Sequence, residues 1–337
     1  MTSKKQHHLK LISLAIFLII CFIISFSLGR YPVTPQELLE VLASQVIPLE
    51  TTWEAEIETI IFQIRLPRVV AAVLIGAALS CAGATYQGLF QNPMVSPDLL
   101  GASAGAGFGA ALAILLGASS YFVSTSAFVF GLLTVSIVWL LSTKVKNNPS
   151  LGLILTGIMI TSLFSAGLSF IKLVADPNDQ LPAITYWLMG SLSSIRQQDV
   201  LYSGIPIVLG LIPLLFLRWK LNVMTMGEEE AQTMGVNTKV LRLLVICCAT
   251  LMTTASVAVS GMIGWVGLVI PHFSRMIVGT DYRVLLPASM LLGASFLLIV
   301  DNFSRLLSTS EIPLGILTAF VGAPFFLYLI FREGNRS

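Results

Sequence analysis

Side chains able to do chemistry are scarce in this chain of 337 residues. It has three histidines: His7 and His8 lie in the N-terminal tail, and His272 has no cluster of carboxylates beside it in the sequence. One histidine cannot hold a metal ion by itself, and a membrane enzyme would need His, Asp or Glu gathered at one interface. We therefore expect no catalytic residue, no metal site and no bound cofactor.

The cysteines offer no redox or metal chemistry either. All four lie inside apolar runs, and no two of them form a C-x-x-C pair. Thiols in such surroundings behave as small apolar groups. We interpret Cys21, Cys81, Cys247 and Cys248 as inert and buried.

Any energy for transport must come from outside this chain. The sequence contains no G-x-x-x-x-G-K-[ST] loop, which would hold nucleotide phosphates. Few Asp, Glu or His residues fall within its apolar segments, whereas a proton relay needs them at membrane depth. These features argue against nucleotide hydrolysis and against a proton relay within this chain. The alternative to a partner that supplies energy is a stand-alone secondary transporter of a small solute, which would need an ion site within the spans.

The composition requires a bilayer as the solvent for much of the surface. Hydrophobic residues make up 55% of the chain and charged residues 11%, and the mean hydropathy is +0.88. Soluble domains carry about 25% charged residues, so this chain cannot cover itself with polar groups in water. The net charge is +2 and the basic residues form no stripe, so we expect no nucleic-acid partner.

The uncharged stretches predict an all-α membrane protein with about ten transmembrane helices in one transmembrane domain. A span must be a helix, because its backbone polar groups have to be satisfied inside the segment. An amphipathic segment at 36–58 and a short interfacial helix at 181–194 are also expected. The predicted spans are 11–29, 69–91, 99–117, 122–143, 147–171, 200–217, 243–260, 263–276, 284–300 and 312–331.

The distribution of positive charge predicts that both termini are cytoplasmic. The first apolar run is longer than a signal-peptide core, and no small-residue cleavage site follows it, so we interpret it as an uncleaved helix. An even number of spans then places both ends on one side. With that side inside, the 19 Lys and Arg residues divide into 13 inner and six outer, as the positive-inside rule requires.

Gly101, Gly105 and Gly109 form a doubled G-x-x-x-G pattern at the start of the third predicted span. Small residues at this spacing let two helix backbones approach closely in lipid. The alternative is a smooth wall beside a pore. We expect helix packing.

Four segments together resemble the FecCD family, the permeases of type II ABC importers. They follow the family's order between Arg30 and Phe331, and no single one is a catalytic signature. The variable segments are most similar to metal-chelate-type permeases that import molybdate or tungstate. The four segments are RLPRVVAAVLIGAALSCAGATYQGLFQNPMVSPDLLGASAGAGFGA from Arg65, GEEEAQTMGV from Gly227, SGMIGWVGLVIPHFSRMIVGTDYRVLLP from Ser260 and EIPLGILTAFVGAPFFLYLI from Glu311.

The resemblance implies a BtuC-like fold in which spans two to five and seven to ten are inverted repeats. It implies a homodimer with the pathway on its two-fold axis, in the inner membrane of a bacterium. Two cytoplasmic ATP-binding subunits and a periplasmic substrate-binding protein would complete the importer. The family carries vitamin B12, haem and iron-siderophores, and the subgroup carries molybdate or tungstate, so the sequence leaves the cargo open.

Three arginines lie where the second and ninth predicted spans reach the outer surface. Arg65 and Arg68 precede the second span, and Arg305 is placed in the loop after the ninth. Arginines at membrane interfaces often snorkel to the surface without a further role. The resemblance gives these three a docking role toward carboxylates on the binding protein, which the planar fork of Arg can hold with two bonds. We expect docking.

The segment 222–239, between the sixth and seventh spans, is expected to contact the ATPase. Three glutamates fall in the first turn of a short helix, where they complement its dipole, and glycines flank that helix. It could be an ordinary solvated loop helix, but the resemblance makes it the coupling helix that fits a groove on the ATPase. The residues assigned to coupling are Gly227, Glu228, Glu229, Glu230, Gly235, His272 and Arg275. The last two, at the inner end of the eighth span, are given a structural or interface role.

The loop between the fourth and fifth spans lies at the expected inner face. It contains Asn147, Asn148, Pro149 and Ser150. The residues themselves carry no unusual signal. The resemblance places the cytoplasmic gate at this loop.

Overall fold

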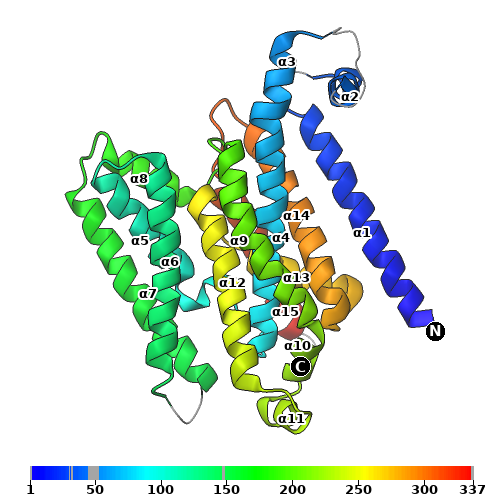
Figure 1. Ribbon diagram of the computed structural model, residues 1–337, viewed down its shortest axis with the longest axis vertical. Helices are drawn as coiled ribbons and strands as arrows, with labels where there is room; N and C mark the ends of the chain where they lie inside the picture. The colour runs from blue at the N-terminus through cyan, green and yellow to red at the C-terminus, as the bar shows by residue number, and fades with distance from the viewer. Residues whose placement is uncertain (1, 30, 32, 45–52, 146–148, 335–337) are drawn as a thin grey trace.

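The computed structural model describes residues 2–29, 31, 33–44, 53–145 and 149–334, and this part of the chain is helical without any strand (Figure 1). The helices form one elongated bundle. They are α1 (Thr2–Ser27), α2 (Pro35–Ser44), α3 (Ala55–Thr59), the π-helix η1 (Ile60–Arg65), α4 (Leu66–Leu89), the 3₁₀ helix η2 (Pro97–Leu100), α5 (Ala102–Leu115), α6 (Ser120–Ser142), α7 (Pro149–Val174), α8 (Gln180–Met189), α9 (Gln197–Phe216), α10 (Arg218–Met224), α11 (Glu228–Thr233), α12 (Thr238–Ser260), α13 (Val266–Val278), α14 (Tyr282–Leu306) and α15 (Leu314–Gly334).

The all-helical membrane fold predicted from the sequence is confirmed. Seven helices in the described part are long and apolar enough to cross a bilayer, and the shorter apolar helices α5, α13 and α15 overlap the other three predicted spans. A count of ten crossings remains a prediction. The interfacial helix predicted at 181–194 appears as α8, and the amphipathic segment contains α2 and α3, with residues 45–52 lying outside the described part.

At two of the predicted span boundaries the helices continue past the arginines. The span predicted from 69 lies in one continuous helical run from Ala55 to Leu89, formed by α3, η1 and α4. The span predicted to end at 300 lies in α14, which continues through Leu306. Arg65, Arg68 and Arg305 therefore lie within helices, and Arg305 is not in a loop. The helices can continue through these charged turns because the arginine side chains have hydrogen-bond and ion-pair partners inside the protein, as described below.

Helix α4 is the centre of the bundle, and neighbouring helices touch it backbone to backbone. A Cβ built on Gly83 would lie 1.7 Å from the carbonyl oxygen of Gly267 in α13. One built on Gly76 would lie 2.3 Å from the carbonyl oxygen of Gly293 in α14. Without a hydrophobic driving force between helices in lipid, such close contact is a main source of attraction.

The doubled G-x-x-x-G pattern packs a second pair of helices, as predicted. A Cβ on Gly105 would lie 1.9 Å from Oγ1 of Thr134, and one on Gly109 would lie 2.6 Å from the carbonyl oxygen of Ser126. Both contacts are with α6, so the glycine face of α5 is buried against that helix.

The two ends of the bundle differ in their elements. Figure 1 shows α3 and α8 toward one end and α11 toward the other, and we call these the α3 end and the α11 end. The first turns of α1 lie toward the α11 end, where Nζ of Lys10 donates to the carbonyl oxygen of Ile277 at 2.6 Å.

Candidate functional site

A buried ionic cluster occupies the α3 end of the bundle. Arg68, in the first turn of α4, is its centre: its Nε donates to Oδ1 of Asp301 at 2.9 Å. Its Nη1 and Nη2 donate to the two carboxylate oxygens of Glu311 at 2.8 and 2.9 Å. The side chain of Arg68 is 6% exposed, that of Asp301 0% and that of Glu311 22%. Two carboxylates thus occupy both edges of one guanidinium.

Arg305 joins the same cluster from the last turn of α14. Its Nε lies 3.3 Å from Oδ2 of Asp301, one turn earlier in the helix. Its Nη atoms donate to Oδ1 of Asn302 and to the backbone carbonyls of Ser25 and Leu28 at the end of α1. Asp301 therefore bridges Arg68 and Arg305, and the cluster ties α1, α4 and α14 together.

Arg65 lies beside these groups but pairs with no carboxylate in the described residues. Its Nη1 and Nη2 donate to the backbone carbonyls of Phe26 and Tyr31. The cluster holds three cations and two anions, so it retains one positive charge. That charge resides on Arg65, which is 4% exposed.

The structure thus brings the three sequence-predicted arginines together but buries them. None of them snorkels outward, because all three side chains are buried inside the chain. Docking itself remains a prediction. Sequence reasoning missed Asp301 and Glu311; the D-x-x-x-R spacing of Asp301 and Arg305, one helical turn apart, was a signal that could have found the first.

The coupling segment lies at the opposite, α11 end. α11 is a helix of six residues between Gly227 and Gly235, whose φ angles of 133° and 81° favour glycine. Glu228 is turned back into the protein, where Oε2 accepts from Nη2 of Arg242 at 2.7 Å and Oε1 accepts from the hydroxyl of Thr238.

The outward face of α11 is acidic. Glu229 and Glu230 are exposed, as are the residues that follow up to Gly235 except Ala231, which is buried. Glu228 therefore anchors the helix, and the two other glutamates remain available at the surface. The sequence analysis assigned the same coupling role to all three glutamates.

Arg242 also approaches the start of α7. Its Nη2 lies 3.4 Å from Oγ of Ser150, the second residue of that helix, while Pro149 is the first. Asn147 and Asn148, the other residues of the predicted gate loop, lie outside the described part. The described half of that loop is thus adjacent to the anchor of α11.

His272 and Arg275 point to different neighbours, although both lie on α13. The ring of His272 packs edge-to-face on Phe325 of α15, with centroids 6.2 Å apart. Arg275 instead reaches α4, where Nη2 donates to Oε1 of Gln87. The two residues predicted as a pair do not form one site.

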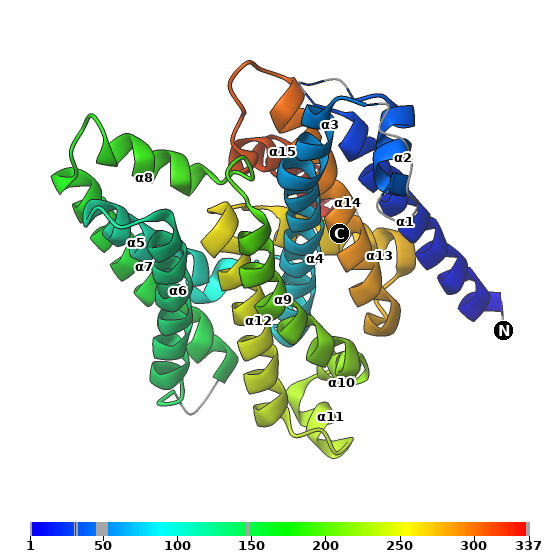
Figure 2. The same cartoon turned by 45° about the horizontal axis from the view of Figure 1, so that its top comes forward.

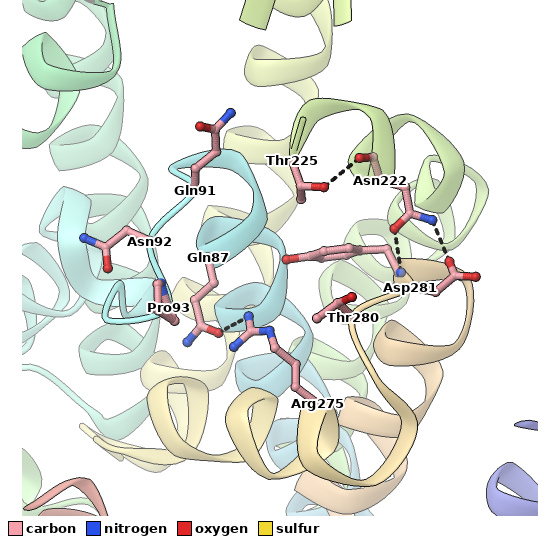
Figure 3. A pocket seen from close by; sticks show the side chains of 10 residues that line it. Gln87, Gln91, Asn92, Pro93, Asn222, Thr225, Arg275, Thr280 and Asp281 are labelled. Carbon is pink, nitrogen blue, oxygen red and sulfur yellow. Dashed lines mark hydrogen bonds between the residues drawn. The ribbon is translucent and has the colours of Figure 1, made fainter. Parts of the chain in front are cut away.

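Arg275 lines a polar cavity of about 510 Å³ at the α11 end (Figure 3). Its Nη1 is buried without a hydrogen-bond acceptor, and Arg275 pairs with no carboxylate in the described part of the chain. Asn222 of α10 donates to Asp281 and accepts from the backbone N–H of Tyr282 on the other side of the cavity. The cavity therefore joins the segment before α11 to the turn between α13 and α14.

These features define a class of protein. The chain is a multi-pass membrane protein with a tightly packed helical core, a buried cationic cluster at one end and an anchored acidic helix at the other. Within the described residues no group of His, Cys, Asp and Glu suits a metal ion. The arrangement is that of a permease subunit.

The comparisons with known proteins identify the family. The family model of the FecCD transport family matches residues 17–332, and the chain belongs to that family. The molybdate import system permease MolB of Haemophilus influenzae is 41% identical over 322 residues, which cover 96% of this chain and 95% of that protein. The Fe(3+)-citrate import system permease YfmE of Bacillus subtilis is 37% identical and covers 100% of this chain and 99% of its own.

A solved structure agrees with these relatives. An inward-facing metal-chelate type ABC transporter superposes with a TM-score of 0.86 at 40% identity, covering 96% of this chain and 98% of the other. The BtuC-like fold expected from the sequence is confirmed. The chain is a permease subunit of the ABC importer class.

Proposed function

We propose that this permease imports an anionic metal species across the inner membrane of a bacterium, delivered by a periplasmic binding protein. The supporting observation is that two sites lie at opposite ends of one helical bundle: the arginine cluster at the α3 end and the anchored acidic helix at the α11 end. An importer needs one surface to receive cargo and another to receive mechanical work. The α3 end is the outer one, and the α11 end is cytoplasmic, as are both chain termini.

The α11 end receives the ATPase. Ion pairing with Arg242 fixes the position of α11, and its outward face presents Glu229 and Glu230 to a groove on the ATP-binding subunit. The uncompensated Arg275 in the neighbouring cavity contributes to the same interface. ATP is hydrolysed by that separate subunit, two copies of which serve a homodimer of this permease.

The proposed homodimer can be tested directly by measuring the mass of the intact permease. Native mass spectrometry of the protein released from detergent should show two copies of the 36.4 kDa chain. A monomeric mass in a preparation that retains transport would remove the homodimer from the proposal.

Molybdate or tungstate is the favoured cargo. The supporting observation is the end-to-end match to a permease named for molybdate import. Ferric citrate is the second candidate, because the relative named for it also matches from end to end. Both are anionic, whereas a neutral cargo such as vitamin B12 is not.

The experiment is uptake into proteoliposomes with the cognate binding protein and ATPase. Labelled molybdate, tungstate, ferric citrate, haem and vitamin B12 should be compared at equal concentration. ATP-dependent uptake of molybdate or tungstate alone is the expected result. Uptake that needs an ion gradient and no ATPase would instead support a stand-alone secondary transporter.

A further inference from the structure

Glu311 occupies the position that an incoming carboxylate would need. It binds Nη1 and Nη2 of Arg68 through both of its oxygens, at 2.8 and 2.9 Å. The Nε edge of Arg68 is taken by Asp301. A guanidinium has two edges that hold a carboxylate with two bonds, and both are filled from within the chain.

The two internal carboxylates differ in how firmly they are held. Asp301 is fully buried in α14 and lies between two cations, Arg68 and Arg305. Glu311 is 22% exposed, has Arg68 as its ion-pair partner and lies in the non-helical stretch before α15. Glu311 is therefore the carboxylate that can leave.

We propose that docking at the α3 end is a carboxylate exchange, in which an acidic side chain of the binding protein replaces Glu311 on Arg68. This inference rests on the proposed function, because it assumes a binding protein at that end. Exchange keeps Arg68 paired throughout, whereas stripping a buried charge of its partner is strongly destabilising. The residual positive charge on Arg65 attracts the incoming acid.

Carboxylate exchange would remove one of the contacts that hold the non-helical stretch between α14 and α15. The stretch after α14 is fixed to that helix by Ser304, whose hydroxyl donates to the carbonyl oxygen of Ile312 at 2.6 Å. The N–H of Leu314 donates to the carbonyl oxygen of Gly190, at the end of α8. Glu311 adds the side-chain tether to α4, and Figure 2 shows this stretch at the top of the bundle between α14 and α15.

The start of α15 is tightly seated, so loss of that tether matters. A Cβ on Gly315 would lie 2.5 Å from the carbonyl oxygen of Met189 in α8 and 3.1 Å from that of Met262. Release of Glu311 thus loosens the contact between α15, α8 and the turn before α13. Glu311 acts as a positioning residue that reports docking to α15.

The test uses Glu311→Gln in the full permease–ATPase complex, with Glu58→Gln as the matched control. Glu58 is an exposed acid of α3 at the same end, and removing it changes the net charge equally without touching Arg68. Glu311→Gln should tighten binding-protein affinity by about five- to tenfold and raise ATPase activity measured without the binding protein. Glu58→Gln should change either quantity by less than about twofold.

Three results would overturn the exchange: unchanged or weaker affinity of Glu311→Gln, unchanged basal ATPase activity, or an equal effect of Glu58→Gln. Failure of the proposed function looks different, because the wild-type complex would then bind no binding protein at all. Should Glu311→Gln fail to fold, hydrogen exchange on the wild type decides. The amides of Ile312 and Leu314 should exchange faster when the binding protein is bound, and equal or slower exchange would contradict the proposal.

Discussion

Arg242 and Glu228 form an ion pair of 2.7 Å that fixes the position of the short helix α11 against the N-terminal part of α12. A helix of six residues has no intrinsic stability in water, so its position must come from such tertiary contacts. Arg242 is 4% exposed at its side chain and Glu228 is 32% exposed. The pair is therefore partly desolvated, and its loss should be measurable.

We expect Arg242→Met to uncouple the permease while leaving it inserted. The change keeps an unbranched apolar stem but removes the guanidinium that holds α11, at a cost of about 1–3 kcal/mol from the unpaired Glu228. ATPase affinity in detergent and transport-coupled ATP hydrolysis should both fall. Glu229→Gln is the control for charge alone, since Glu229 is exposed; a loss of coupling as large as that of Arg242→Met would show that α11 needs its charge and not its anchor.

The backbone contact between α4 and α13 should tolerate no methyl group. Gly83→Ala places a Cβ 1.7 Å from a carbonyl oxygen, so the two helices must separate. Overpacking of this kind costs about 1–3 kcal/mol or more, and we expect a lower melting temperature in detergent. Gly264→Ala is the matched control, because nothing lies within 4 Å of its Cβ. Equal melting of both variants would show that α13 is free to shift away from α4.

Charge reversal at Arg305 should act mainly by lowering the stability of the folded protein, and not by a direct effect on docking. Arg305→Glu would put a carboxylate beside Asp301, which is fully buried. Loss of a buried partner costs about 3–5 kcal/mol, so we expect little folded permease. Arg196→Glu serves as the control, since Arg196 is exposed at the same end and should fold normally. Both variants should be compared by size-exclusion chromatography, for monodispersity, and by thermal unfolding. A well-folded Arg305→Glu would mean that the ionic cluster is dispensable for the fold.

The turn between α13 and α14 should make stability depend on pH through Asp281. Burial raises the pKa of this carboxyl, but hydrogen bonds from Asn222 and from the N–H of Arg283 outweigh that effect and hold the pKa below its ordinary value. Since the folded-state pKa is lower than the unfolded one, the stabilisation is complete above the unfolded pKa. It is lost as the pH falls through the folded pKa, below about pH 4.

Asp281→Asn should therefore lower the melting temperature near neutral pH and flatten the decrease in melting temperature on acidification. The variant keeps the size of the side chain but loses the charge that caps α14. Melting curves of wild type and variant across an acid pH series are the measurement. Parallel curves would assign the acid sensitivity to other groups.

The sequence alone determined the class of fold and the family. In a bilayer the backbone N–H and C=O groups must be hydrogen-bonded within the protein, so a long apolar segment predicts a helix. Each of the ten predicted segments overlaps a helix of the structure. Gly105 and Gly109 likewise predicted a helix contact, because small residues at a spacing of four let two helix backbones approach closely. The acidic helix between Gly227 and Gly235 was visible from its flanking glycines.

Tertiary structure alone decided what the charged residues do. Arg68 is 233 positions from Asp301 and 243 from Glu311, so no local pattern reveals that its charge is neutralised inside the protein. The same applies to Glu228, which resembles its two neighbours in sequence but differs because Arg242 lies beside it. An arginine or glutamate has the same identity whether it is exposed or paired, and only the packing of distant helices determines its partner, its burial and therefore its energetic role.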